Sequence, residues 1–132
     1  MTISKLLLGA AALVMLAGPA FAEDQPSDLK TMMIGGKTVI TDAKGMTLYT
    51  FDKDGKGAMT STCADKCAAA WPPAYAAAGA KPVGEYTLVK SADGKDMWAY
   101  DGWPLYGWVK DTKAGDTTGD MVGNVWHTAV EH

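Results

Sequence analysis

One short phrase occurs twice in this chain, and it constrains the fold more than any other feature. The first copy covers residues 45–54 and the second covers residues 102–111, at a constant offset of 57 residues. A repeat of this kind predicts two related units built into one body. Residues at matching places define the motif: Tyr49, Phe51 and Asp54 in the first copy, and Tyr106, Trp108 and Asp111 in the second.

The motif residues are expected to serve the architecture. Alternation along a strand places Tyr49 and Phe51 on one face, and Tyr106 and Trp108 on the corresponding face of the second copy. Aromatic side chains at alternate positions bury a large apolar area, which favours core packing. The Asp that ends each motif is suited to accept hydrogen bonds from turn amides. The alternative is an aromatic face that binds a ligand.

Residues 1–22 have the pattern of an export signal. Lys5 provides the positive start, residues 6–15 form a short apolar run, and Ala20-Phe21-Ala22 is a small-x-small cleavage pattern. The apolar run is shorter than the roughly 20 residues that span a bilayer. We therefore expect cleavage after Ala22, the alternative being an uncleaved membrane anchor. The mature chain is expected in the bacterial periplasm or outside the cell, with membrane contact only through the signal peptide before cleavage.

The charge composition of the chain limits the classes of partner that it is expected to bind. The chain of 132 residues has a net charge of −3, contains no Arg, and carries its Lys residues singly. No basic stripe is present, so nucleic acid is not an expected partner. The size fits one domain. We expect a flexible lead-in at 23–35 and a single β domain at 36–132, with repeats at about 36–73 and 86–130.

The local patterns predict a mainly β fold. Strands are expected at six places: 38–41, 46–51, 86–90, 97–100, 103–109 and 125–130. Asp-Gly pairs at 93–94 and 101–102 predict hairpin turns. One helix is expected at 61–71, capped by Thr62 and stopped by Pro72. The predicted architecture is a small antiparallel sheet or barrel-like domain built from two diverged hairpin repeats, with one short helix carrying a Cys pair.

Cys63 and Cys67 are the only cysteines. In an exported protein such a pair predicts a structural disulfide. Residues four apart on a helix have Cα atoms about 6 Å apart, which a disulfide can bridge, and a Cys63 in the cap region would ease closure. The spacing is one residue longer than the C-x-x-C redox motif. Thiol redox chemistry and metal ligation are the alternatives.

The tryptophan and histidine residues are candidates for ligand binding, but their positions in the sequence do not define a single site. Four tryptophans are candidates for stacking on a flat ligand, although a small core could also absorb them: Trp71, Trp98, Trp103 and Trp126. No cofactor is expected, with copper as the alternative; His127, the one internal His, is its candidate ligand. No nucleophile motif occurs, so the chain is not expected to be an enzyme. The prediction is an exported non-catalytic module that binds an unknown small ligand or envelope component; the alternative is a periplasmic copper or redox-associated protein.

The repeated Y-x-(F/W)-x-x-D motif resembles the bacterial family of secreted repeats of unknown function, which are described as predicted lipoproteins. Further matches are the C-x-x-x-C before Trp71-Pro72-Pro73, the run at 98–106 and the tail at 115–127. The resemblance covers residues 36–127 and implies no established activity. Many such proteins look lipid-anchored through a Cys after the signal peptide. Here Glu23 and Asp24 follow Ala22, so this chain is expected to be released and not lipid-anchored.

Overall fold

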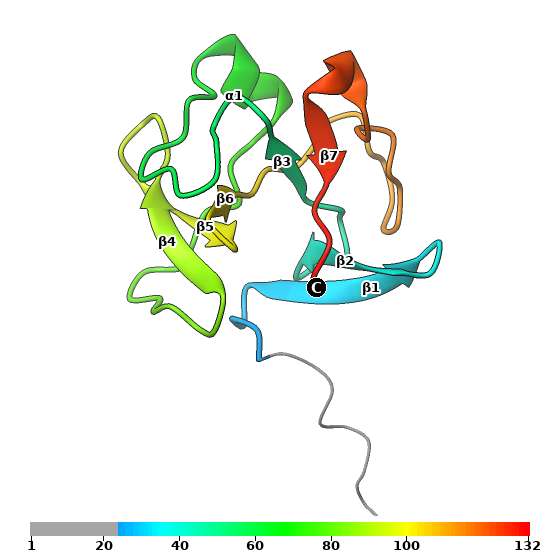
Figure 1. Ribbon diagram of the computed structural model, residues 1–132, viewed down its shortest axis with the longest axis horizontal. Coiled ribbons are helices and arrows are strands. Elements are labelled where there is room, and N and C mark those ends of the chain that lie inside the picture. The colour runs from blue at the N-terminus through cyan, green and yellow to red at the C-terminus, as the bar shows by residue number, and fades with distance from the viewer. Residues whose placement is uncertain (1–23) are drawn as a thin grey trace, which may run out of the picture.

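The structure is a computed structural model that describes residues 24–132, so the predicted signal peptide lies outside the described residues. Figure 1 shows short strands and one small helix joined by long connections. In chain order the elements are β1 (Leu29–Ile34), β2 (Lys37–Asp42), β3 (Tyr49–Phe51), α1 (Lys66–Ala70), β4 (Tyr86–Lys90), β5 (Asp96–Tyr100), β6 (Trp103–Pro104), the 3-10 turn η4 (Val122–Asn124) and β7 (Trp126–Thr128). Within 24–132, no helix has the length and apolar character needed to cross a membrane.

The strands form three small antiparallel sheets. β1 pairs with β2, β3 pairs with β7, and β4, β5 and β6 form the third sheet. Each repeat opens with a hairpin, β1–β2 in the first and β4–β5 in the second. The first hairpin turns at Gly35 and Gly36, whose φ angles of 59° and 80° suit glycine and the twist of a tight turn. The predicted mainly β fold with hairpin repeats and one short helix is confirmed.

The end of the second repeat completes the sheet of the first. Leu48 donates its backbone N–H to the Ile40 carbonyl, Ile40 donates to Ala129, and Ala129 donates back to Leu48, each at 2.9 Å. We call this closed set the first backbone triangle. Figure 1 shows the same connection at a larger scale, since β7 near the C-terminus lies beside β3 of the first repeat.

The end of the first repeat completes the second in the same way. Leu105 donates to Trp98 at 2.9 Å, Trp98 donates to Ala74 at 2.8 Å, and Ala74 donates to Leu105 at 2.9 Å. This second backbone triangle has the same pattern, with Ala74 in the place of Ala129. Because each triangle takes one member from the other repeat, neither repeat closes its own backbone hydrogen bonds.

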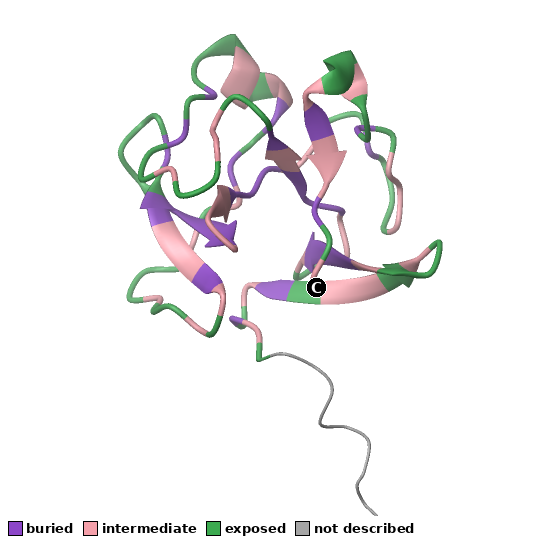
Figure 2. Ribbon diagram, viewed as in Figure 1, coloured by how far each residue is buried: buried purple, intermediate pink, exposed green. Residues whose placement is uncertain are grey.

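Two hydrophobic clusters form the core. The first gathers around the motif aromatics and contains Tyr49, Phe51, Cys63, Trp71, Val89, Met97, Ala99, Tyr106 and Trp126. The second contains Leu29, Ile40, Leu48, Tyr86, Trp98, Tyr100, Leu105 and Ala129. Figure 2 shows β5 buried along almost its whole length, while the peripheral turns are exposed. Both clusters draw residues from both repeats, so the chain has a shared core.

The lead-in prediction was wrong for residues 29–34. This segment is β1, in register with β2 from Leu29 opposite Asp42 to Ile34 opposite Lys37. Leu29 is 4% exposed and belongs to the core. The run of Lys, Thr and Met residues lacks clear alternation, but ladder pairing with β2 satisfies its backbone groups and overrides this weak local signal.

The predicted helix at 61–71 was wrong at its beginning. α1 covers only Lys66–Ala70, because Asp65 before it has a φ of 55° that a right-handed helix cannot contain. Thr62 does not cap the helix; its N–H and hydroxyl donate to Asp54 at 2.8 and 2.7 Å. The predicted Cys63–Cys67 disulfide is confirmed. Its Cα atoms are 5.2 Å apart, and Cys63 lies outside the helix.

Three predicted strands are shorter than expected. The strand at 103–109 was wrong beyond β6: Leu105 still donates its N–H to Trp98 of β5, but Tyr106 then bridges Tyr49 and Pro73 and does not continue the ladder. The strand expected at 46–51 is reduced to β3. Before β3, Thr47 forms an isolated bridge with Thr41 of β2. The last strand, expected at 125–130, is β7 at Trp126–Thr128.

Candidate functional site

The two motif copies meet at their tyrosines. Tyr49 and Tyr106 form an antiparallel bridge with N···O distances of 2.7 and 2.9 Å. The Tyr49 hydroxyl donates to Asp111 Oδ2 at 2.6 Å, and the Tyr106 hydroxyl donates to Asp54 Oδ2 at 2.6 Å. Each phenol therefore bonds to the aspartate of the other repeat. We refer to these as the crossed Tyr–Asp pairs.

The second oxygen of each aspartate holds a loop of its own repeat. Asp111 Oδ1 accepts the N–H of Thr118 at 2.9 Å and its hydroxyl at 2.6 Å. Asp54 Oδ1 accepts the same two groups of Thr62. Asp111 is 7% exposed, whereas Asp54 is half-buried. Each carboxylate thus connects the phenol of one repeat to a loop of the other, which is an architectural role.

Burial and the neighbouring carboxylates act together on the two phenols. Both tyrosines are 0% exposed. Desolvation, followed by the hydrogen bond to Asp111, raises the pKa of Tyr49 far above its usual value. Desolvation and the bond to Asp54 raise the pKa of Tyr106 in the same way. The phenols are held neutral, as proton donors to the carboxylates.

We expect the free energy of unfolding to fall at alkaline pH because of the Tyr49 and Tyr106 phenols. The pKa of each phenol is raised in the folded state, so its contribution to the free energy of unfolding is complete below the unfolded pKa of about 10. This contribution is lost as the pH rises toward the folded pKa values. Each tyrosine then removes up to about 1.4 kcal/mol of unfolding free energy per pH unit. Ultraviolet titration should show Tyr49 and Tyr106 ionising only with unfolding. Ionisation of all five tyrosines before the circular dichroism changes would contradict this account.

Beside the crossed pairs lies a stack of four aromatic rings. Its order is Phe51, Trp126, Trp71 and Trp108, with centroid distances of 4.1, 3.8 and 3.9 Å between successive rings. The rings come alternately from the first and the second repeat. Trp71 and Trp126, at the centre, are each 4% exposed, while Trp108 at the end is half-buried. Tyr49 meets Trp71 edge-on at 5.5 Å.

The tryptophans singled out in the sequence occupy different environments. Trp71 and Trp126 have both faces covered inside the stack. Trp98 is 1% exposed and donates its indole N–H to Asp28 at 2.9 Å. Trp103 is half-buried and lines a shallow hollow of about 210 Å³. The structure therefore does not gather these four side chains into one site.

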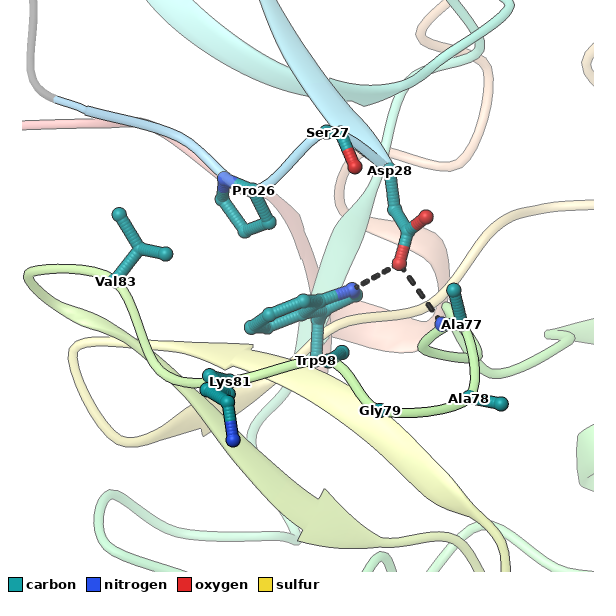
Figure 3. A pocket seen from close by; sticks show the side chains of 10 residues that line it. Pro26, Ser27, Asp28, Ala77, Ala78, Gly79, Lys81, Val83 and Trp98 are labelled. Atoms are coloured by element: carbon teal, nitrogen blue, oxygen red, sulfur yellow. Dashed lines mark hydrogen bonds between the residues drawn. The ribbon is translucent and has the colours of Figure 1, made fainter.

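One hollow lies beneath the segment that connects the repeats. It has a volume of about 420 Å³ and is lined by residues 26–28, 77–81, Val83 and Trp98. Figure 3 shows the Trp98 ring at its floor and the Asp28 carboxylate beside it. Asp28 Oδ2 accepts both the Trp98 indole N–H and the Ala77 backbone N–H, each at 2.9 Å. This carboxylate ties the connecting segment to the body of the protein.

A second hollow, which we call the interface groove, lies where the repeats meet. Its volume is about 350 Å³, and its lining comes from both repeats: Asp28, Leu29, Asp42, Met46, Leu48, Pro72–Tyr75 and Gly107–Val109. Tyr75 and Val109 are 45% and 54% exposed, so both offer apolar surface to solvent at the groove. Sequence reasoning missed both, because only the folded arrangement brings Tyr75 of the first repeat beside Trp108 and Val109 of the second.

His127 lies on the surface strand β7. Its Nε2 is 2.9 Å from Asp52 Oδ2, and its side chain lines a hollow of about 450 Å³ together with Asp120 and Met121. Imidazole and thioether groups are ligands that copper accepts. Copper binding at His127 stays a prediction.

Another group of possible metal ligands was not predicted. Glu85, Asp101 and His132 place one donor atom each within 4.8 Å of one another, the one such group found within 24–132. His132 Nε2 is 3.2 Å from Glu85, and the Lys56 ammonium lies 3.3 Å from Asp101. Asp101 is thus paired with the Lys56 ammonium and Glu85 contacts the His132 ring, so both acids already have partners within the protein.

Together, the triangles, crossed pairs and stack define a duplicated β protein whose repeats complete each other. A family model described as a secreted repeat of unknown function matches residues 30–75 and 87–130. The chain belongs to this family of secreted repeats, which places it among exported proteins. Searches of curated proteins and of solved structures each return no match.

Proposed function

We propose that this exported protein is a non-catalytic binding module and that its ligand lies in the interface groove. The observation that carries the proposal is the groove's combination of exposed apolar side chains with a fixed aromatic ring, Trp108. The polar atoms of the repeated motif are committed to the crossed Tyr–Asp pairs, which leaves binding to the surface around them. We place its action in the periplasm or outside the cell, without a lipid anchor.

The aromatic walls of the groove are fixed before a ligand arrives. Trp108 stacks on Trp71 at 3.9 Å. Tyr75 donates its hydroxyl to Asp93 at 3.1 Å, and the Lys95 ammonium lies 5.5 Å from its ring centroid. Side chains that are already ordered lose little conformational entropy on binding. A preformed surface of this kind favours a rigid ligand with a flat face.

The acidic residues of the groove indicate the chemistry of that ligand. Asp28 and Asp42 line it beside the apolar side chains. Asp42 Oδ1 accepts the backbone N–H groups of Lys44 and Met46, at 2.8 and 3.0 Å, which fixes the carboxylate. Fixed carboxylates accept hydrogen bonds from hydroxyl groups, and aromatic rings pack against flat apolar faces. A sugar ring of an envelope glycan offers both features.

The test uses a soluble oligomer of β-linked N-acetylglucosamine and the mature chain. We expect saturable binding by calorimetry and a change in tryptophan fluorescence. Val109→Glu, which places a charge on the exposed apolar rim, should weaken binding tenfold or more, because an ion must be desolvated against the ligand. Met59→Glu is the matched control, since Met59 is 76% exposed and does not line the groove.

Two results would count against the proposal. Failure of the unmodified protein to bind the oligomer would remove the glycan assignment, and equal affinity in the Val109→Glu and Met59→Glu variants would remove the groove. The non-catalytic part is tested separately by mass spectrometry of the oligomer after long incubation. We expect its length to be unchanged; the appearance of shorter products would show hydrolysis.

A further inference from the structure

The surface between the repeats joins distant segments of the chain through hydrogen bonds and stacked aromatic rings. We divide the described chain into a first half (24–76), a connector (77–85) and a second half (86–132). We propose that this surface also joins two copies of the chain, which form a dimer by exchanging halves when the connector cannot close within one chain. The partner is therefore the same repeat supplied by another molecule.

The contacts between the halves are reciprocal. Tyr49 of the first half bonds to Asp111 of the second, and Tyr106 of the second bonds to Asp54 of the first. The backbone triangles and the alternating aromatic stack cross the same boundary. None of these contacts requires the halves to belong to one chain. When two chains exchange halves, each contact forms twice with unchanged geometry, which makes such exchange a low-cost route to a dimer.

Only the connector makes the monomer closed. Figure 3 shows its beginning held by Asp28, whose Oδ2 accepts the Ala77 N–H at 2.9 Å. Near its end, Val83 forms a short bridge with Tyr86. Ala77 to Gly79 are exposed, and a Cβ added at Gly79 would meet no atom within 4 Å. Opening the connector breaks these contacts, the hydrogen bond from the Asp101 N–H to the Glu85 carbonyl at 3.0 Å and the packing of Ala80 against the second core cluster, while the surface between the halves remains available.

The ends of the connector lie on opposite edges of β5. Met97 of β5 pairs with Val89 of β4 on one side and bridges Tyr75 on the other. The first half ends beside Asp96, to which Ala76 donates a hydrogen bond, at the beginning of β5. Two strand spacings amount to about 9.5 Å across the sheet.

The connector must also run the length of β5. Tyr86, where the second half begins, pairs with Tyr100 at the end of β5. Four residues of strand from Asp96 to Tyr100 span about 13 Å, so with the step across the sheet the direct separation is roughly 16 Å. A connector that reaches less than this cannot close within one chain.

The experiment removes residues 78–84 from the mature chain. The link from Ala76 to Tyr86 then contains only Ala77 and Glu85 and reaches about 11 Å at most. We expect a soluble dimer of twice the monomer mass by light scattering, with unchanged circular dichroism. Replacing the same residues by Gly and Ser at equal length is the control, which should remain monomeric at low concentration.

A second measurement decides the case in which the shortened chain does not fold. A protease site is placed at Gly79 of the full-length connector. One preparation carries a tag on its first half, and the other carries a different tag on its second half. Both are cleaved, unfolded, mixed and refolded. Recovery of complexes that carry both tags supports the proposal. A shortened chain that is a folded monomer contradicts it, as does a shortened chain that fails to fold while the cleaved halves do not recombine.

Discussion

Replacing Trp71 by Ala should lower the free energy of unfolding by about 4 kcal/mol, in the middle of the range for buried aromatic residues. Trp71 is 4% exposed and lies between Trp126 at 3.8 Å and Trp108 at 3.9 Å. Tyr49 also meets its ring edge-on at 5.5 Å. Removing the indole opens a cavity at the centre of the stack and takes a partner from both repeats. Urea unfolding followed by far-ultraviolet circular dichroism measures the loss.

The stack itself supplies the controls for this prediction. Trp126 occupies the equivalent place, between Phe51 and Trp71, so Trp126→Ala should cost a similar amount. Trp108 ends the stack and is half-buried, so Trp108→Ala should cost clearly less, about 2 kcal/mol. If Trp108→Ala destabilised the protein as much as Trp71→Ala, the stack would not be the centre of the core.

The second large effect is expected for Asp111→Ala, with a loss of about 3–4 kcal/mol. Asp111 is 7% exposed and accepts three hydrogen bonds, from the Tyr49 hydroxyl and from the N–H and hydroxyl of Thr118. The substitution leaves the buried Tyr49 hydroxyl without its acceptor, which costs more than the loss of the bond itself, and it also releases the exposed Thr118. Chemical unfolding of the two proteins at neutral pH gives the difference.

Asp54 is the matched comparison within the same molecule. It accepts the equivalent three bonds, from Tyr106 and Thr62, but it is half-buried. Water can reach part of that site, so Asp54→Ala should cost less, about 2 kcal/mol. A larger loss for Asp54→Ala than for Asp111→Ala would show that burial does not set the strength of the two pairs.

Much of the architecture follows from local sequence signals. The hairpin at 86–100, the mainly β class and the Cys63–Cys67 disulfide are each predictable from patterns within a few residues, and the duplication is predictable from the recurring motif. The same offset of 57 residues relates β1 to β4, since β1 begins at Leu29 and β4 begins 57 residues later at Tyr86. The segment 29–34 looked like a lead-in because its own alternation is weak, although its counterpart in the second repeat is clear.

The crossing of the repeats could not be predicted in this way. Tyr49 and Asp54 are close in the sequence, and nothing in the pattern tells whether the phenol bonds to its own Asp or to Asp111. That choice depends on the antiparallel bridge between Tyr49 and Tyr106, a contact across the whole molecule. The interface groove was missed for the same reason, because Tyr75 becomes a neighbour of Trp108 and Val109 only after the repeats have joined.

The central claim is that the repeats bond across to each other, and a pair of double-mutant cycles tests it directly. Unfolding free energies are measured for Tyr49→Phe, Asp111→Ala, Asp54→Ala and the two double variants that contain Tyr49→Phe. Groups in direct hydrogen-bond contact show coupling of roughly 0.5–3 kcal/mol, whereas independent sites add within about 0.5 kcal/mol. We predict coupling of about 1.5 kcal/mol or more between Tyr49 and Asp111, and additivity between Tyr49 and Asp54. Strong coupling of Tyr49 to Asp54, with additivity toward Asp111, would contradict the crossed arrangement.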